Sequence, residues 1–189
     1  MSQDNRIRCG WAESTPDYRD YHDDEWGVVL RGDDALYERM SLEAFQSGLS
    51  WLTILRKRSA FRAAFSGFAI ADVAAFGDAD VARLMADADI VRNRAKINAT
   101  IANARAALEL PGGLSELLWS FAPTPPPARP ATLADVPATS PESVAMAKEL
   151  KRRGFAFVGP TTSYALMQAT GMVDDHVAGC WRAAPSGSA

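Results

Sequence analysis

Both cysteines and both histidines of this chain occur as two pairs far apart in the sequence. Cys9 and His22 form the first pair, and His176 and Cys180, four residues apart, form the second. On a helix, residues four apart project from one face, as neighbouring metal ligands do. Two cysteines and two histidines make a complete tetrahedral zinc site, which is typical of a structural ion. We therefore predict one structural zinc ion per chain that joins the two ends. The alternative is four unrelated buried residues.

A single carboxylate stands out in an apolar helical stretch. Glu43 falls between Leu36 and Met40 on one apolar side of a predicted helix. Leu42 and Phe45 make the other side apolar too. A carboxylate in such surroundings must find a partner or change its protonation state, and such groups are frequent in binding sites. The alternative is a structural acid bonded to the backbone or to an arginine.

Aromatic residues gather around the same part of the chain. Five of them lie within 41 residues: Trp11, Tyr18, Tyr21, Trp26 and Trp51. Flat, electron-rich rings near a carboxylate suit a planar cationic ligand, through stacking and cation–π attraction. Ordinary core packing is the alternative for any one of them.

Basic residues form three clusters, at 56–62, 92–96 and 148–153. Charges on helices are usually only a solvated face. The third cluster differs because it runs into Gly154 and a short turn, 155–159, before another predicted helix. A helix, a glycine-bearing turn and a second helix can offer backbone N–H groups to a phosphate.

Helical periodicity dominates the chain, and strand signals are nearly absent, so we predict an all-α fold. Helices are expected over 33–47, 51–65, from Asp80 onward, 90–110, 114–121, 141–153 and 161–170, and a last short one holding His176 and Cys180. Asp33 or Asp34, Ser50 and Ser140 are the expected N-terminal caps of three of them. The proline-rich stretch 123–130 is expected to be a stiff connector or lobe boundary within one domain of residues 1–189, and 183–189 a flexible tail.

Length and composition exclude several classes of protein. The 189 residues carry a net charge of -3, so a dominant basic field is absent and any DNA contact must rest on local patches. No apolar run is long enough for a membrane span, and the start has no signal-peptide pattern. We therefore expect a cytoplasmic protein without membrane contact, in which a disulfide between the two cysteines is not expected.

Three blocks in order carry a family resemblance. CGWAESTPDYRDYHDDEWG (9–27), LEAFQSGLSWLTILRKR (42–58) and KRRGFAFVGPTTSYALMQATGMVDDHVAGC (151–180) resemble the 3-methyladenine DNA glycosylase I family. The resemblance covers essentially residues 8–180. It implies an all-helical member of the helix-hairpin-helix glycosylases, which hydrolyses 3-methyladenine from alkylated DNA in base excision repair and has a zinc ion clasping its termini.

The resemblance also implies roles for individual residues. It places the zinc on Cys9, His22, His176 and Cys180, in agreement with the spacing argument. Glu43 and Tyr21 would be catalytic, with Glu43 reading the purine edge, and Tyr18, Trp26 and Trp51 would bind the excised base. The loop at Gly48 and Leu49 would fill the gap left by the flipped nucleotide, and the turn holding Phe155, Val158 and Gly159 would grip the DNA backbone.

Two positions depart from the family pattern. Ala44 stands where many members have glycine, which would narrow the pocket slightly. Asp174 stands where many members have asparagine. A related superfamily branch uses an aspartate in a comparable region for bond cleavage, but Asp174 adjoins a predicted zinc ligand and would orient His176 instead.

The implied partners are alkylated double-stranded DNA and the 3-methyladenine base, and the protein is expected to act as a monomer. The enzyme must extrude the nucleotide from the duplex, which is less costly for a damaged base. N3-methylation makes the purine cationic, so it departs as a neutral base with little acid assistance, and water is the nucleophile. The alternative is a non-catalytic, zinc-clasped module that binds damaged or bent DNA. A zinc hydrolase is disfavoured because four protein ligands leave no position for water.

Overall fold

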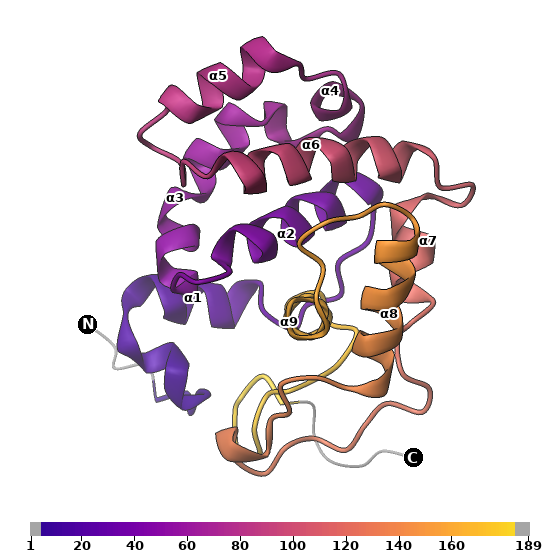
Figure 1. Ribbon diagram of the computed structural model, residues 1–189. Helices are drawn as coiled ribbons and strands as arrows, with labels where there is room; N and C mark the ends of the chain where they lie inside the picture. Colours follow the sequence, from indigo (N-terminus) through magenta and orange to yellow (C-terminus); the bar gives the residue numbers. More distant parts are fainter. Residues whose placement is uncertain (1–4, 184–189) are drawn as a thin grey trace.

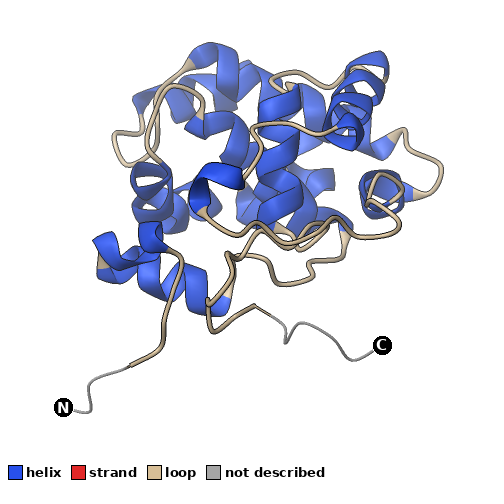
Figure 2. Ribbon diagram, turned by 90° about the horizontal axis from the view of Figure 1, so that it is seen from below, coloured by secondary structure: helices blue, strands red, loops and turns tan. Residues whose placement is uncertain are grey.

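The computed structural model of the protein describes residues 5–183, and every regular element in that range is helical (Figures 1 and 2). The α-helices are α1 (Pro16–Asp24), α2 (Asp33–Gln46), α3 (Trp51–Ala64), α4 (Ile70–Ala74), α5 (Asp78–Ala86), α6 (Arg94–Leu108), α7 (Gly113–Trp119), α8 (Pro141–Arg152) and α9 (Pro160–Ala169). Three short 3-10 helices join them: η1 (Gly10–Ser14), η2 (Ser66–Phe68) and η3 (Leu133–Asp135). The all-α prediction is confirmed. No helix in the described range is long and apolar enough to cross a membrane.

Helix α2 is the centre of the packing. Leu36, Tyr37 and Phe45 are completely buried, and Met40 nearly so. Figure 1 shows α6 running across α2 on one side and α9, seen end-on, beside it on the other. Because the middle of α2 is enclosed by its neighbours, the polar residues Arg39, Ser41 and Glu43 are buried as well.

The serine caps are confirmed, whereas the aspartate caps are not. Ser50 accepts a hydrogen bond from the Thr53 amide and starts α3, and Ser140 caps α8 in the same way. Gly32, not Asp33 or Asp34, precedes α2. Both carboxylates instead accept hydrogen bonds from the first turns of other helices. Asp33 accepts from the Ser115 amide of α7, and Asp34 accepts from the Ile70 amide of α4.

Several boundaries differ from the predicted ones. Helix α5 begins at Asp78 rather than Asp80, because the Asp80 carboxylate accepts from the Gly77 amide and so belongs to the first turn. The Ala-rich helix α6 begins only after Asn93, whose side chain caps it. Helix α1 was not expected. Thr15 caps it and Pro16 is its first residue.

The predicted last helix is wrong. Residues 174–180 form no helix, and His176 and Cys180 lie on an irregular segment with a turn at Ala178–Gly179. The Asp174 side chain bonds the backbone amide of His176, and Gly179 has a positive φ of 86°, which is left-handed rather than helical. The i,i+4 argument for these two ligands therefore rested on a helix that does not form.

The proline-rich connector packs against this irregular segment. The Pro130 carbonyl accepts a hydrogen bond from the Ala178 amide, and Arg129 pairs with Asp174. Residues 184–189 of the predicted tail lie outside the described residues.

Candidate functional site

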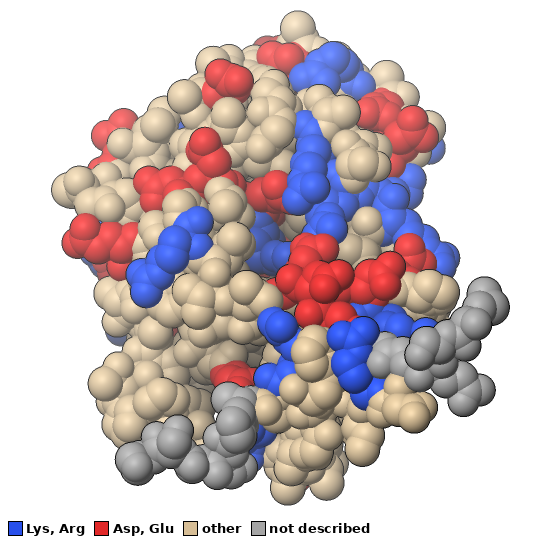
Figure 3. Space-filling view, turned by 180° about the vertical axis from the view of Figure 1, so that it is seen from behind, with Lys and Arg blue, Asp and Glu red and all other residues tan. Residues whose placement is uncertain are grey.

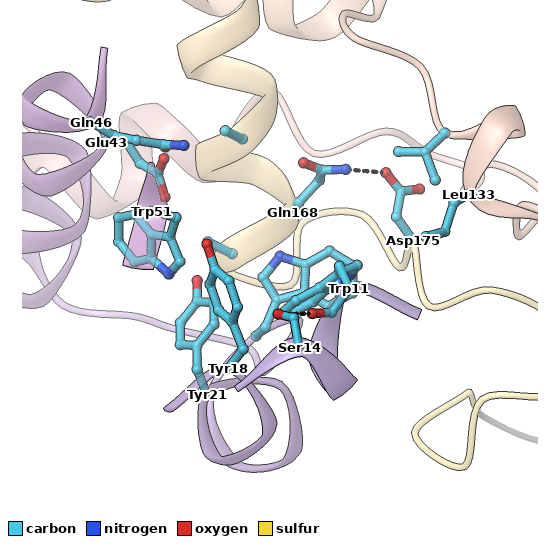
Figure 4. A pocket seen from close by; sticks show the side chains of 14 residues that line it. Trp11, Ser14, Tyr18, Tyr21, Glu43, Gln46, Trp51, Leu133, Gln168 and Asp175 are labelled. Atoms are coloured by element: carbon cyan, nitrogen blue, oxygen red, sulfur yellow. Dashed lines mark hydrogen bonds between the residues drawn. The ribbon is translucent and has the colours of Figure 1, made fainter. Parts of the chain in front are cut away.

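A cavity of about 540 Å³ lies where the N-terminal helices meet α2, α3 and α9. Aromatic side chains form much of its wall (Figure 4). The residues that line it are Trp11, Ser14, Tyr18, Tyr21, Trp26, Glu43, Gln46, Trp51, Leu133, Val136, Ala165, Gln168, Ala169 and Asp175. All five residues predicted for the base pocket are among them.

Glu43 reaches this cavity from the buried face of α2. Its carboxylate is 5% exposed and forms no hydrogen bond with any other described residue. Burial raises the pKa of Glu43 to about 7, and the positive charge of Arg39 opposes that rise. The alternative of a structural acid bonded to arginine or to the backbone is therefore not what the structure shows. The carboxylate has acceptor capacity for a ligand.

Tyr21 and Trp51 form the wall beside Glu43. Their ring centroids are 5.4 Å apart. The Tyr21 hydroxyl accepts a hydrogen bond of 2.9 Å from Nη1 of Arg39, and burial raises the pKa of Tyr21, so it stays protonated. The indole Nε1 of Trp51 is buried and has no partner within the described residues. A buried donor without a partner is costly, so it marks a position where a ligand acceptor fits.

Tyr18 and Trp26 complete the aromatic wall. The Tyr18 hydroxyl accepts from the Leu52 amide in the first turn of α3, which fixes its ring. Trp11 stands edge-on to both Tyr18 and Trp26, with ring centroids 5.7 and 5.2 Å away. Trp11 was noted in the aromatic cluster but was not predicted as a site residue.

The sequence reasoning missed a second carboxylate in the cavity. Asp175 is 5% exposed, and its Oδ2 accepts hydrogen bonds from the Tyr164 hydroxyl and from Gln168 Nε2, at 2.8 and 2.7 Å. Figure 4 shows Asp175 and Glu43 on opposite sides of the cavity. The Asp174–Asp175 pair was the available signal, and only the irregular backbone decides which of the two faces inward.

The other predicted cluster forms beside the aromatic wall. Ligand atoms of Cys9, His22 and Cys180 all lie within 4.8 Å of one another, and all three residues are buried. Cys180 Sγ is 3.4 Å from His22 Nε2. Burial raises the pKa of the Cys9 thiol to about 12 and lowers the pKa of His22, which keeps its imidazole neutral. This group can hold a metal ion.

His176, the fourth predicted ligand, lies next to this group but is not among the residues whose ligand atoms are within 4.8 Å of one another. Its centroid is 5.1 Å from that of His22, and its Nε2 is buried without a partner in the described part of the chain. Asp174 accepts at Nδ1 of His176 and Asp23 at Nδ1 of His22, each at 2.9 Å. Each imidazole therefore uses one nitrogen for a carboxylate and leaves Nε2 for a metal, the usual arrangement of histidine ligands.

Gly27 makes room for the His176 ring. It has a φ of 77°, and a Cβ at this position would lie 2.5 Å from Cε1 of His176. Both the backbone conformation and the lack of space exclude other residues.

Asp23 ties this cluster to both ends of the described chain. It accepts hydrogen bonds from Arg8 and from the Trp181 indole in addition to His22. Although burial opposes them, these bonds hold the pKa of Asp23 well below its usual range. The carboxylate is therefore a charged acceptor that fixes the His22 ring.

The loop after α2 lies at the surface. Gly48 has a φ of 81°, and the Leu49 side chain is 42% exposed. Lys96 of α6, itself only 7% exposed, donates to the carbonyls of Phe45 and Ser47 at 2.9 and 2.6 Å. A buried cation thus holds the end of α2 and the start of this loop.

The turn between α8 and α9 divides its residues between core and surface. Phe155 and Val158 are buried and Gly159 is partly exposed, and the Phe155 amide donates to the Leu150 carbonyl at 3.0 Å. Phe157 is 41% exposed and has a φ of 56°, an uncommon conformation for an aromatic residue. This exposed residue was not among the predicted contacts.

Three arginines of the first basic cluster, 56–62, form ion pairs that neutralise part of its charge. Arg56 pairs with Asp17, Arg58 with Glu25 and Arg62 with Glu38. Figure 3 shows basic and acidic side chains interspersed on the face it presents.

The fold and the cavity are those of a helical DNA glycosylase. The structure is similar to a crystal structure of 3-methyladenine DNA glycosylase I, with a TM-score of 0.89 and 43% identity, covering 93% of this chain and 99% of that one. It is also similar to a tyrosine-to-phenylalanine variant of 3-methyladenine DNA glycosylase I solved with 3-methyladenine, with a TM-score of 0.86 and 32% identity over 96% of this chain and 98% of that one.

Sequence comparison agrees. DNA-3-methyladenine glycosylase 1 of Escherichia coli (strain K12) is 46% identical over 177 residues, which is 92% of this chain and 95% of that protein. The family model for methyladenine glycosylase matches residues 11–183, and the chain belongs to this family.

Proposed function

We propose that this chain is a DNA-3-methyladenine glycosylase of base excision repair, which flips an alkylated adenine out of DNA and hydrolyses its N-glycosidic bond. The observation that carries the proposal is the buried Glu43 carboxylate, without a hydrogen-bond partner, inside an aromatic cavity. The family relationship supports it, and a relative has been solved with 3-methyladenine bound.

The cavity matches the chemistry of a cationic purine. Its rings offer stacking faces, and the ionised form of Glu43, which a cationic base favours, offers a charge-assisted acceptor for the exocyclic amine of the base. The unpartnered Trp51 Nε1 and the Tyr21 hydroxyl offer donors for ring nitrogens. In this proposal Glu43 and Tyr21 act on the base directly, whereas Tyr18, Trp26 and Trp51 hold it.

Little acid catalysis is required. N3-methylation gives the purine a positive charge, so when the C1′–N9 bond breaks its electron pair leaves with the base, which becomes neutral. Water then adds to C1′ and releases a proton to solvent. Orientation of the nucleotide and exclusion of bulk water can supply much of the rate.

The residues at the two ends would hold one structural zinc ion. Cys9, His22, His176 and Cys180 supply the sulfur and nitrogen donors of a closed tetrahedral site. The Nε2 of His176, unpartnered among the described residues, the contact of His22 Nε2 with the Cys180 sulfur, and the two carboxylates behind the imidazoles support this assignment. The ion would bind the N-terminal wall of the cavity to the segment that carries Asp175.

Contacts with double-stranded DNA would come from two surface features. The exposed Leu49, after Gly48, can fill the space of the flipped nucleotide. In the turn at Phe155, Val158 and Gly159, the backbone N–H groups of Val158 and Gly159 can donate to a phosphate, whereas the Phe155 amide already donates to the Leu150 carbonyl. Since one chain supplies every part of the site, we propose that it acts as a monomer.

Incubation of the purified protein with methylated duplex DNA, followed by chromatography of the released bases, tests the proposal. We expect free 3-methyladenine, and none from an unmethylated duplex. DNA binding without base release would instead support a non-catalytic module for damaged DNA.

A further inference from the structure

A buried cation lies directly behind the aromatic wall of the cavity. Arg39 is 7% exposed and sits one helical turn before Glu43 on α2. Its guanidinium carbon is 5.2 Å from the Tyr21 ring centroid and 5.3 Å from that of Trp51. Arg39 is therefore separated from the cavity by the two rings that flank Glu43.

A hydrogen bond from Arg39 makes the Tyr21 hydroxyl oxygen an acceptor and leaves its hydrogen for another partner. Nη1 of Arg39 donates to the hydroxyl oxygen at 2.9 Å, so the hydroxyl hydrogen must point elsewhere. No acceptor for this hydrogen exists among the described residues, and Tyr21 lines the cavity. A hydroxyl that accepts from a cation becomes a better donor, because hydrogen bonds in a chain polarise one another.

Other charges hold Arg39 in place without cancelling it. Glu25 lies 3.5 Å from Arg39 Nη2 but makes its closer pair with Arg58, at 2.7 Å to Oε1. The two arginines thus share one carboxylate. The charge that remains faces the rings and Glu43.

We propose that Arg39 is a positioning residue for base excision, which fixes Tyr21 as a hydrogen-bond donor into the cavity and sets a permanent positive charge behind the leaving base. This proposal rests on the proposed function. Tyr21 touches the base and Arg39 acts through it.

The charge change of the reaction gives Arg39 its effect. Before cleavage the base is cationic, and after the C1′–N9 electron pair has moved onto it the base is neutral. A fixed positive charge disfavours the cation relative to the neutral product, so it favours departure. Glu43 has the opposite preference and favours capture of the cation. Glu43 therefore favours binding of the cationic base, and Arg39 favours cleavage of its bond to the sugar. Such a difference between the binding of reactant and transition state is what accelerates a reaction.

Single-turnover excision of 3-methyladenine by Arg39→Met, with Arg39→Gln as a second uncharged variant, tests the proposal. We expect the rate to fall about tenfold or more, since hydrogen bonds to charged groups contribute that much. The affinity for methylated DNA should not weaken. Arg39→Lys keeps the charge and should recover part of the rate. Arg62→Met removes an exposed arginine from the neighbouring helix and should stay within a factor of two.

A double-mutant cycle distinguishes this role from a structural one. In a Tyr21→Phe background the loss of Arg39 should cost clearly less, because the hydroxyl through which it acts is gone. A merely structural role would lower the melting temperature and the amplitude of the single-turnover phase but not its rate. An unchanged rate in both uncharged variants, or an equal cost with and without the Tyr21 hydroxyl, would overturn the proposal. A parent protein that releases no 3-methyladenine would overturn the proposed function as well.

Discussion

The Cys180 sulfur lies 3.4 Å from Nε2 of His22, although 158 residues separate the two in sequence. Cys9 lies beside both, and the His176 ring stands edge-on to His22, with the ring centroids 5.1 Å apart. His22 belongs to α1, whose neighbouring residues Tyr18 and Tyr21 line the cavity. A metal ion at this point would therefore stabilise the base pocket and not only the ends of the chain.

We expect protein purified without chelators to contain one zinc ion per chain. Cys180→Ala or prolonged chelation should remove it, because metal binding of this kind is coupled to folding. A loss of about 3 kcal/mol would lower the melting temperature by roughly 6 to 12 °C in a chain of this size. Metal analysis and thermal unfolding measure both effects. Absence of zinc from the parent protein would contradict this prediction.

Glu43→Gln keeps the shape of the side chain and removes its charge. Excision of 3-methyladenine should fall by about one to two powers of ten, since a charge-assisted hydrogen bond contributes roughly 1.5 to 3 kcal/mol. Much of the preference for 3-methyladenine over adenine should disappear. Single-turnover excision and titration with free base are the measurements. If both remain within a factor of two of the parent, Glu43 has no part in recognition.

The stability of the protein should depend on pH through Glu43. Burial raises the folded pKa to about 7 from 4.5, so between these values the folded state binds more protons than the unfolded state. Stability therefore falls as the pH rises across this window, by up to about 3 kcal/mol, and stays lower above it. Relative to the parent, Glu43→Gln should gain more stability at pH 8 than at pH 5. The exposed Glu109→Gln is the control, and chemical unfolding at both pH values is the measurement. An equal difference at the two pH values would refute the linkage.

Leu49→Ala should separate DNA processing from base binding. The exposed leucine would fill the space of the flipped nucleotide, and losing its contact area costs roughly 1.5 to 3 kcal/mol, or about tenfold or more in excision from duplex DNA. Affinity for free 3-methyladenine should not change. Leu108→Ala, at an exposed leucine on α6, should affect neither. Equal excision by Leu49→Ala and the parent would place the wedge elsewhere.

The salt dependence of DNA affinity should depend on Lys151 of the third basic cluster more than on its neighbour Arg152. Arg152 is engaged by Glu149 in two hydrogen bonds of 2.7 and 2.6 Å, whereas Lys151 is exposed and has no such partner. Lys151→Gln should reduce the slope of log affinity against log salt by about 0.9, the value for one phosphate contact. Arg152→Gln should change it less. Affinity measured over a salt series checks this, and an unchanged slope for Lys151→Gln would move the interface to another cluster.

Local signals predicted much of the fold. Ser50 and Ser140 start helices as expected, because their capping bonds involve residues only three positions away. Asp33 and Asp34 look like equally good caps, but their carboxylates accept from backbone amides 82 and 36 residues later, in the first turns of other helices. Such long-range use of a side chain is not visible in the sequence around it.

In the candidate site, too, local sequence signals predicted some residues, and long-range packing determined the others. The types of Cys9, His22 and Cys180 were enough to group them, although the helix assumed for Cys180 does not form. Asp175 and Arg39 were missed because nothing in their local pattern separates them from ordinary acids and bases. Only the packing of α2 and the irregular C-terminal segment shows that each lies at the cavity or directly behind its wall.

The backbone amide of Trp181 donates to the carbonyl of Ile7 at 2.8 Å, beside the Cys/His group. Both segments lie along the lower edge of the view in Figure 2. During synthesis on the ribosome, this contact cannot form until almost the whole chain has emerged. A product that ended before residue 174 would lack His176, Cys180 and the segment that carries Asp175. The complete lining of the cavity therefore depends on the last part of the described chain, because Asp175 and the contact of Trp181 with Ile7 both lie there.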